Sequence, residues 1–408
     1  MSTHQELVDV KASPAYDPFD YDLHEDPYPT YAWMREHAPL YRNEERDFWA
    51  LSRHADVLAA LRAPATFSNR NGISLEPDLW GPDAVKTSSF LAMDPPEHGA
   101  MRRLTAPVFK PGWVASMEPT VRRLARERLA PLRDGADFDF AADFAAALPN
   151  DVMCEVVGIP AADRDLIRAD NDLLNECEDG TPERSDATTG AGRRLAYYYV
   201  TLISDRRKRP RDDLTSVLVQ ARIDGRPLTD QQLVAYLFLL VSATNESTGK
   251  LIGNALYHGW RLPGLQRAGL DGRAADWGRE SLRYDSPSQM MARTLTADTV
   301  IHGTEVPAGA RIALLPASGN RDERVFADPD VFDLDRDTSG ELSFGHGPHF
   351  CQGAPLARLE ITVALEELGA VVHAYEVDTS RARRIHSPHQ RGFASLPCSV
   401  SLRGRVTR

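Results

Sequence analysis

The sequence reads Phe344-Gly345-His346-Gly347-Pro348-His349-Phe350-Cys351-Gln352-Gly353 just before an apolar, helix-like run that begins at Ala354. Two glycines and a proline make this loop turned and stiff, and they place one cysteine directly ahead of a helix start. Backbone N–H groups and the positive end of the helix dipole favour the thiolate over the thiol. The loop therefore predicts a metal-binding cysteine, because such hydrogen-bond donors tune a metal-bound thiolate.

For a lone cysteine the alternative is a buried thiol in a glycine-rich turn. Here, however, the spacing of all ten residues resembles the haem-binding loop of the cytochrome P-450 family, F-x-x-G-x-x-x-C-x-G. The resemblance implies that Cys351 is the proximal ligand to the iron of haem b. It also implies that Phe344 shields the sulfur, that Gly353 lets the next helix approach the macrocycle, and that His349 contacts a haem propionate. Gln352 departs from the family, where an apolar residue is more usual.

Two further segments resemble propionate-binding positions of that family. The segment Asp94 to Arg103 resembles D-P-P-x-H-x-x-x-R, and it places His98 and Arg102 four residues apart. On a helix these two side chains share a face and can bind a carboxylate pair. The alternative is a capped helix start with a solvent-facing histidine. Arg293 stands where relatives have another propionate ligand.

Glu280 and Arg283 form an E-x-x-R motif on a predicted helix. The spacing places both side chains on one face, where they can pair. A surface ion pair is the default interpretation of such a motif. In the cytochrome P-450 family the same motif is internal and fixes the loop that leads to the cysteine. The resemblance implies Arg336, in the segment 326–336, as the third partner.

The segment Ala243 to Thr248 interrupts an apolar helix with polar residues. Relatives usually have A-G-x-D/E-T-T here, in which the glycine opens a groove for O2 and the acid–alcohol pair delivers protons. In this chain Thr244 replaces the glycine, Glu246 keeps the acid, and Ser247 keeps a hydroxyl. The resemblance implies a catalytic role for these three residues. A buried polar kink without chemistry is the alternative.

Helical patterns dominate the rest of the chain, and the predicted strands are short. The predicted helices are 121–132, 193–206, 230–258 (with Thr229 or Asp230 as the cap) and 355–372. The predicted strands are 48–52, 299–302, 311–315 and 399–402, of which the second and third are expected to form one small sheet. The segment 318–343 is expected to be a long ordered loop.

The resemblance covers residues 17–402 and implies one domain, 17–408, after an N-terminal tail, 1–16. The implied fold is mainly α-helical with small β-sheets, a triangular prism around a buried haem.

Composition restricts the class of partner. The net charge of −12 argues against a nucleic-acid binder. Residues 1–14 have no apolar core of a signal peptide, and the most apolar run, 233–243, is too short to span a bilayer. We therefore expect a cytoplasmic protein that does not enter a membrane. The other three cysteines, Cys154, Cys177 and Cys398, are widely separated and predict neither a disulfide framework nor a zinc site.

The resemblance implies a monooxygenase that activates O2 and inserts one oxygen atom into a small-molecule substrate. No flavin or nicotinamide fingerprint is present, so electrons are expected from a ferredoxin and a ferredoxin reductase. The predicted docking patch for an acidic ferredoxin consists of Arg102, Arg103, Lys110, Arg122, Arg123 and Arg126. The alternatives are oxidative coupling, desaturation or peroxide-driven chemistry, and a non-catalytic haem sensor.

The resemblance also implies a substrate pocket with apolar walls, suited to a fairly large apolar or aromatic molecule. Its expected wall residues are Ile73, Leu75, Leu79, Trp80, Phe90, Leu91, Leu240, Met290, Met291 and Phe393.

Overall fold

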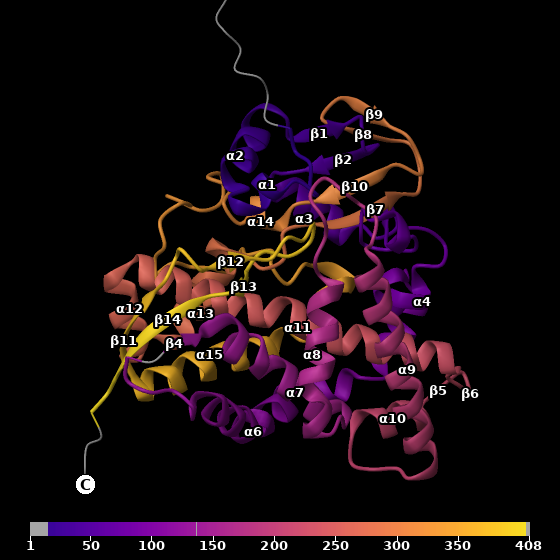
Figure 1. Ribbon diagram of the computed structural model, residues 1–408. Coiled ribbons are helices and arrows are strands. Elements are labelled where there is room, and N and C mark those ends of the chain that lie inside the picture. Colours follow the sequence, from indigo (N-terminus) through magenta and orange to yellow (C-terminus); the bar gives the residue numbers. More distant parts are fainter. Residues whose placement is uncertain (1–14, 136, 405–408) are drawn as a thin grey trace, which may run out of the picture.

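The computed structural model describes residues 15–135 and 137–404, without the side chains of Asn245, Glu246 and Pro263. Helices make up about half of the described residues and dominate the ribbon (Figure 1). The helices of seven residues or more are α2 (Tyr28–His37), α3 (His54–Arg62), α5 (Glu97–Arg103), α6 (Pro111–Leu129), α7 (Ala147–Val157), α8 (Arg164–Leu174), α9 (Asp186–Lys208), α10 (Leu214–Gln220), α11 (Asp230–Arg261), α12 (Pro263–Leu270), α13 (Ala274–Tyr284) and α15 (Ala354–Val371).

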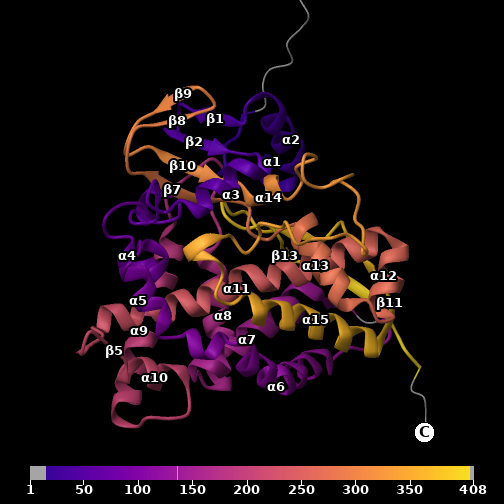
Figure 2. The ribbon, with the colours of Figure 1, turned by 180° about the vertical axis from the view of Figure 1, so that it is seen from behind.

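Helix α11 is the central element. It runs through the middle of the molecule beside α15, as both views of the ribbon show (Figures 1 and 2). It begins as the sequence predicts. The Thr229 hydroxyl accepts from the backbone N–H of Gln232, and the Gln232 side chain accepts from the Thr229 N–H, which forms a capping box. Helices α7, α9, α12 and α13 pack around it, and the largest apolar core cluster lies among these helices.

The predicted helices exist, with different ends. Helix α6 begins at Pro111, ten residues before the predicted start at Val121. It includes Pro119, a residue that breaks most helix patterns, so the sequence pattern predicted only the part that follows it. Helix α9 is likewise longer than predicted, since Ser185 caps its start through the N–H of Thr188.

The strands of the largest sheet gather at one end of the molecule, at the top of Figure 1. The largest sheet has the order β1 (Leu40–Asn43), β2 (Phe48–Leu51), β10 (Arg311–Leu314), β7 (Met291–Leu295) and β3 (Phe67–Ser68), with only the β2–β10 pair parallel. The second sheet has the order β11 (Val372–Val377), β14 (Pro397–Leu402) and β4 (Asp137–Asp139). Two-stranded pairs are β5 (Arg222–Ile223) with β6 (Arg226–Pro227), β8 (Thr299–Ile301) with β9 (Thr304–Val306), and β12 (Arg383–Arg384) with β13 (Phe393–Ser395).

The predicted sheet of segments 299–302 and 311–315 is wrong in its pairing. Strand β8 pairs with β9 across His302 and Gly303, which both have positive φ, as a tight hairpin turn requires. Strand β10 pairs instead with β2 and β7, which are distant in the sequence.

The first described residues bear on the boundary of the predicted tail. Residues 1–14 of that tail lie outside the described residues. Tyr16, expected in the tail, is buried against the rings of Tyr31, Tyr41 and Phe48 and belongs to the folded part. Within the described residues, no helix has the length and apolar character needed to cross a membrane.

Candidate functional site

The cysteine loop is held in one conformation by its glycines and by backbone hydrogen bonds. Gly345 and Gly347 have φ of 66° and 69°, in the left-handed region that favours glycine. A Cβ on Gly347 would lie 2.7 Å from the Leu61 carbonyl oxygen, so a side chain does not fit there. The Cys351 N–H donates to the Phe344 oxygen at 2.8 Å, and α15 begins three residues later, at Ala354.

Two opposing effects act on the pKa of the Cys351 thiol. Burial raises the pKa of the thiol, while the N–H groups of Gly353 and Ala354 and the guanidinium of Arg102 act to lower this pKa. Since burial has the larger effect, the apoprotein favours the thiol. A cation bound to the sulfur reverses this preference, because a coordinating thiol is deprotonated.

Cys351 lies in the wall of a cavity beside α11. Helix α11 contributes Leu240, Ala243, Thr244, Ser247 and Thr248 to this cavity, and the cysteine loop contributes Phe344, His349 and Gly353. A Cβ built on Gly353 would meet one neighbour within 4 Å, the Cys351 sulfur at 3.9 Å. Apart from that sulfur, Gly353 therefore borders open space, so a flat group can lie against the start of α15.

Four basic side chains, those of His98, Arg102, Arg293 and His349, gather beside the cavity. The rings of His98 and His349 lie 4.0 Å apart. Arg293 is 3% exposed and donates to the Ala292 carbonyl oxygen and the Met291 sulfur. Arg102 donates to carbonyl oxygens of the cysteine loop. Burial, followed by the charges of His98, Arg293 and Arg102, lowers the pKa of His349 to about 2.

Several polar atoms of this basic set have no partner among the described residues. They are Nε2 of His98 and both ring nitrogens of His349. Leaving buried donors unpaired costs about 1–3 kcal/mol each. A dianion with two carboxylates facing the set would offset this cost and would pair with the charges of Arg102 and Arg293. The residues therefore fit haem, with iron at Cys351 and propionates at the basic set.

Comparison with known proteins decides the family. The protein "Putative cytochrome P450 123" of Mycobacterium tuberculosis is 47% identical over 390 residues, which is 95% of this chain and 97% of that protein. This chain belongs to the cytochrome P450 family. It is therefore a haem-thiolate monooxygenase. The family model "Cytochrome P450" matches residues 279–402, which include the E-x-x-R motif and the cysteine loop.

Solved P450 structures agree with the fold over nearly the whole chain. Cytochrome P450 CYP109Q5 from Chondromyces apiculatus matches with a TM-score of 0.84 and 31% identity, covering 95% of this chain and 98% of that one. CYP109E1 from Bacillus megaterium, solved in complex with testosterone, matches with a TM-score of 0.85 and 29% identity, covering 93% and 98%. The mainly α fold with small sheets is thus the P450 fold.

The P450 motif on α11 places two hydroxyls in the cavity wall. Thr244 donates to the Leu240 carbonyl oxygen and Ser247 to the Ala243 carbonyl oxygen, both at 3.0 Å. These bonds to the preceding turn leave the hydroxyl lone pairs available to accept. The side chain of Glu246, predicted to act with them, lies outside the described residues.

Glu360 is a cavity residue that the sequence analysis missed. It lies on α15, is fully buried, and lines the same cavity as Ser247 and Thr248. Neither carboxyl oxygen has a partner among the residues described, and burial raises its pKa well above the usual range. The sequence contains a signal that Glu360 is buried. It falls on the apolar face of a helix, four residues after Leu356 and four before Ala364.

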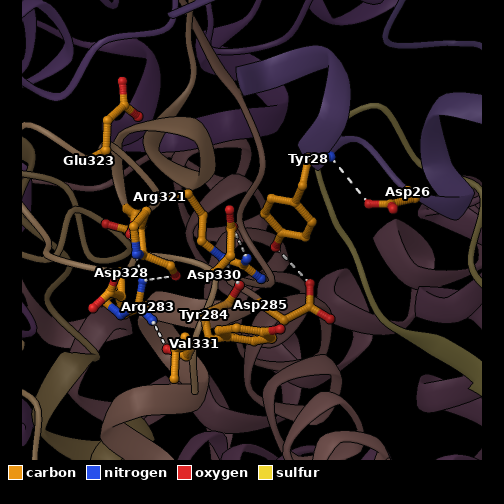
Figure 3. A network of polar contacts seen from close by, with 12 residues as sticks. Asp26, Tyr28, Arg283, Tyr284, Asp285, Arg321, Glu323, Asp328, Asp330 and Val331 are labelled. Atoms are coloured by element: carbon orange, nitrogen blue, oxygen red, sulfur yellow. Dashed lines mark hydrogen bonds and ion pairs between the residues drawn. The ribbon is translucent and has the colours of Figure 1, made fainter. Parts of the chain in front are cut away.

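The E-x-x-R motif forms an internal network rather than a surface pair. Arg283 is 0% exposed and donates to both Glu280 oxygens, at 2.6 and 2.9 Å. Arg336 adds a contact to Glu280 at 3.2 Å. Both arginines also donate to carbonyl oxygens of the segment 320–331, and Figure 3 shows Arg283 reaching Val331. The network thus fastens helix α13 to the long loop that leads to Cys351.

Half of the predicted substrate-pocket residues line the cavity, namely Ile73, Phe90, Leu91, Leu240 and Met291. The other half do not. Leu75 and Met290 are buried in a separate cluster near the five-stranded sheet, and Trp80 packs against that cluster. Leu79 lies in a short 3₁₀ turn, Pro77–Leu79, and Phe393 packs on Tyr257. Neighbours such as Met290 and Met291 separate because successive residues of extended backbone face opposite ways.

The predicted docking patch is largely neutralised by internal ion pairs. Arg122 contacts Glu118, Glu366 and Glu367, and Arg126 contacts Glu367 at 2.7 Å. Arg123 pairs with Glu127, and Arg102 turns toward the cysteine loop. Of the six predicted patch residues, Arg103 and Lys110 are exposed and have no ion pair among the described residues.

Proposed function

We propose that this P450 hydroxylates a fairly large apolar or aromatic small molecule, a product of secondary metabolism, with electrons from a ferredoxin and its reductase. The observation that supports this proposal is one cavity lined by Cys351, by an apolar wall and by three of the four basic residues, Arg102, Arg293 and His349. When bound, haem b ligated by a thiolate supplies reductive activation of O2 and cleavage of its O–O bond. One oxygen atom enters a substrate C–H bond, and the other leaves as water with two protons.

In this proposal the chain's residues hold the cofactor at three places. Cys351 binds the iron. His98, Arg102, Arg293 and His349 hold the propionates. Phe344 and Gly353 border the sulfur side. Their unpartnered donors and the open space beside Gly353 support the assignment.

Proton delivery is assigned to side chains of α11. The Ser247 hydroxyl, with Thr244 as a secondary group and Glu246 as the acid, accepts and passes protons at the cavity wall. Glu360 has a carboxyl that burial keeps protonated, but it lies on α15, the helix that follows Cys351, and is not assigned to this relay.

The substrate class is supported by the cavity wall and by a relative. The wall near α11 combines Ile73, Phe90, Leu91, Leu240 and Met291, which bind apolar surface without requiring charge. The Bacillus megaterium structure contains testosterone, a large and mostly apolar molecule. We propose a substrate of the same physical class, large and mostly apolar, for this chain.

The first experiment tests whether Cys351 ligates the haem iron. The reduced, carbon-monoxide-bound protein should show the red-shifted Soret band of thiolate-ligated haem, and Cys351→Ala should lose it. Cys154→Ala is the matched control, since Cys154 is buried on α7 and does not line the cavity. Retention of the band in Cys351→Ala would overturn the assignment.

Turnover then separates the alternatives. With NADH, ferredoxin, reductase and isotope-labelled O2, hydroxylation incorporates label into product. Label-free coupled or desaturated product would instead favour the other reaction types, and turnover with peroxide alone would favour peroxide-driven chemistry. The absence of any product across a substrate panel that shifts the haem spin state would favour a sensor.

The electron donor is tested through Lys110, one of the two exposed cations of the predicted patch that have no ion pair among the described residues. Lys110→Glu should slow reduction by an acidic ferredoxin at low ionic strength and lose this effect at high salt, since exposed charges are screened. Arg126→Gln is the control, because Arg126 already pairs with Glu367. Reduction measured by stopped-flow should change less in the control, and equal rates in both variants would place docking elsewhere.

A further inference from the structure

A second cavity, of about 290 Å³, lies apart from the one beside Cys351 and shares none of its lining residues. It is formed where the β12–β13 hairpin meets the C-terminal half of α11 and the end of α1 (Tyr21–Glu25). Figure 1 shows this hairpin near α11 and α13. The lining residues are Glu25, Tyr257, Thr379, Ala382, Arg383, Arg384, His386 and Phe393.

Arg384 is the main charged group in the wall of this cavity. Its side chain is 10% exposed, and its guanidinium lies 4.4 Å from the Phe393 ring centre and 5.5 Å from that of Tyr257. The carboxylate of Glu25 approaches to 3.9 Å, too far for a hydrogen bond, and is itself 62% exposed. Asp285, whose charge also acts on Arg384, is paired with Arg391 and His258, so Glu25 is the carboxylate that Arg384 approaches, and that carboxylate is solvated.

Two polar nitrogen atoms in the wall of this cavity are buried and have no hydrogen-bond partner in the part of the chain that the structure describes. They are Nη1 of Arg384 and Nδ1 of His386. The ring of His386 is fixed by stacking on Tyr21 at 3.6 Å, so its other nitrogen cannot turn away freely. A buried polar atom without a partner costs free energy, which a bound ligand or water can offset.

The positive charges of neighbouring arginines favour the binding of an anion in this cavity. Arg391 adds a positive charge, but it is committed to Asp285, which also binds His258 and Tyr28, as Figure 3 shows for Tyr28. Arg383, adjacent to Arg384, lines the same cavity. Burial and the charge of Arg391 lower the pKa of Arg384. Glu25 is the one carboxylate that lines the cavity.

We propose that this cavity binds a small planar organic molecule with an oxyanion, a carboxylate or a phosphate monoester. The Arg384 fork, the group best suited to such oxyanions, holds the anionic end, and His386 contributes its free ring nitrogen. The aromatic face of Tyr257 holds the flat apolar part. This site does not depend on the proposed substrate of the haem cavity.

The test uses the haem-loaded protein with the first cavity blocked by 4-phenylimidazole. Benzoate and phenyl phosphate, as carboxylate and phosphate probes, are titrated by calorimetry. We expect saturable binding of one molecule per chain, without a change in the Soret band. Arg384→Leu should weaken binding at least tenfold, whereas Arg383→Leu, the adjacent control, should weaken it less.

Two further variants keep the test independent of stability. Arg384→Lys retains the charge without the fork and should bind with reduced affinity. Glu25→Gln removes the competing carboxylate and should bind more tightly than the unmodified protein. The probe with the higher affinity identifies the carboxylate or the phosphate as the preferred anion. The absence of saturable binding of both probes, or equal affinity in the unmodified and Arg384→Leu proteins, would overturn the proposal.

Discussion

Two buried glutamates of this P450 differ in how the protein treats their charge. Glu280, on α13, is 1% exposed and receives hydrogen bonds from Arg283 and Arg336. Glu360, on α15, is 0% exposed and has no partner among the residues that the structure describes. The first carboxylate holds a loop in place, because a buried ion pair is costly to break. The second favours its neutral form and can hold a proton at the cavity wall.

The largest effect is expected from breaking the paired glutamate. Arg283→Ala leaves Glu280 as a partly compensated buried charge and should lower the free energy of unfolding by about 3–5 kcal/mol. The measurement is urea unfolding together with haem content. Arg279→Ala is the matched control on the same helix. Its side chain is half exposed and pairs with Asp276, so a loss of at most about 1 kcal/mol is expected. Equal losses in both variants would mean that the network does not hold the loop.

The second prediction removes the charge that Glu360 can acquire. Its folded-state pKa is raised by burial above the unfolded value of about 4.3, so the folded protein holds the proton more tightly. This group's contribution to stability is full below about pH 4.3 and is lost as pH rises toward the folded pKa. Glu360→Gln lacks this loss, so its stability relative to the unmodified protein should rise with pH.

The expected slope of this difference is on the order of 1 kcal/mol per pH unit between pH 5 and the folded pKa. Urea unfolding at several pH values measures it. Glu366→Gln, at a neighbouring exposed glutamate paired with Arg122, should show no such rise. A pH-independent difference for Glu360→Gln would mean that the carboxyl is ionised and solvated, like an ordinary surface acid.

The smallest expected effect concerns the two hydroxyls of α11 that line the same cavity as Glu360. Ser247→Ala should release several-fold more hydrogen peroxide per NADH and form less product, because a proton donor at the cavity wall is lost. Thr244→Ala should have a smaller effect, since Thr244 stands where relatives have glycine. The ratio of peroxide to product under turnover is the measurement. A larger loss in Thr244→Ala would exchange the two roles, and unchanged ratios in both would mean that water delivers the protons.

Local sequence patterns predicted the start of α11 and the cysteine loop, because each of these features depends on a few consecutive residues. The Thr229 cap lies directly before α11, and the spacing from Phe344 to Gly353 sets the turn that carries Cys351. The start of α6 was less predictable. Pro119 is unfavourable inside a helix, but the packing of α6 against α15 stabilises the helix on both sides of it.

The sequence by itself determined the family, the cysteine loop and the long polar-interrupted helix, because spacing along the chain encodes them. Tertiary structure alone decided that Met291 faces the cavity while Met290 faces another core, and that Arg126 is neutralised by Glu367 from α15. It also decided that Glu360 is buried without a partner. Burial and pairing depend on groups brought together from distant parts of the chain, and a local pattern carries no information about which groups those are.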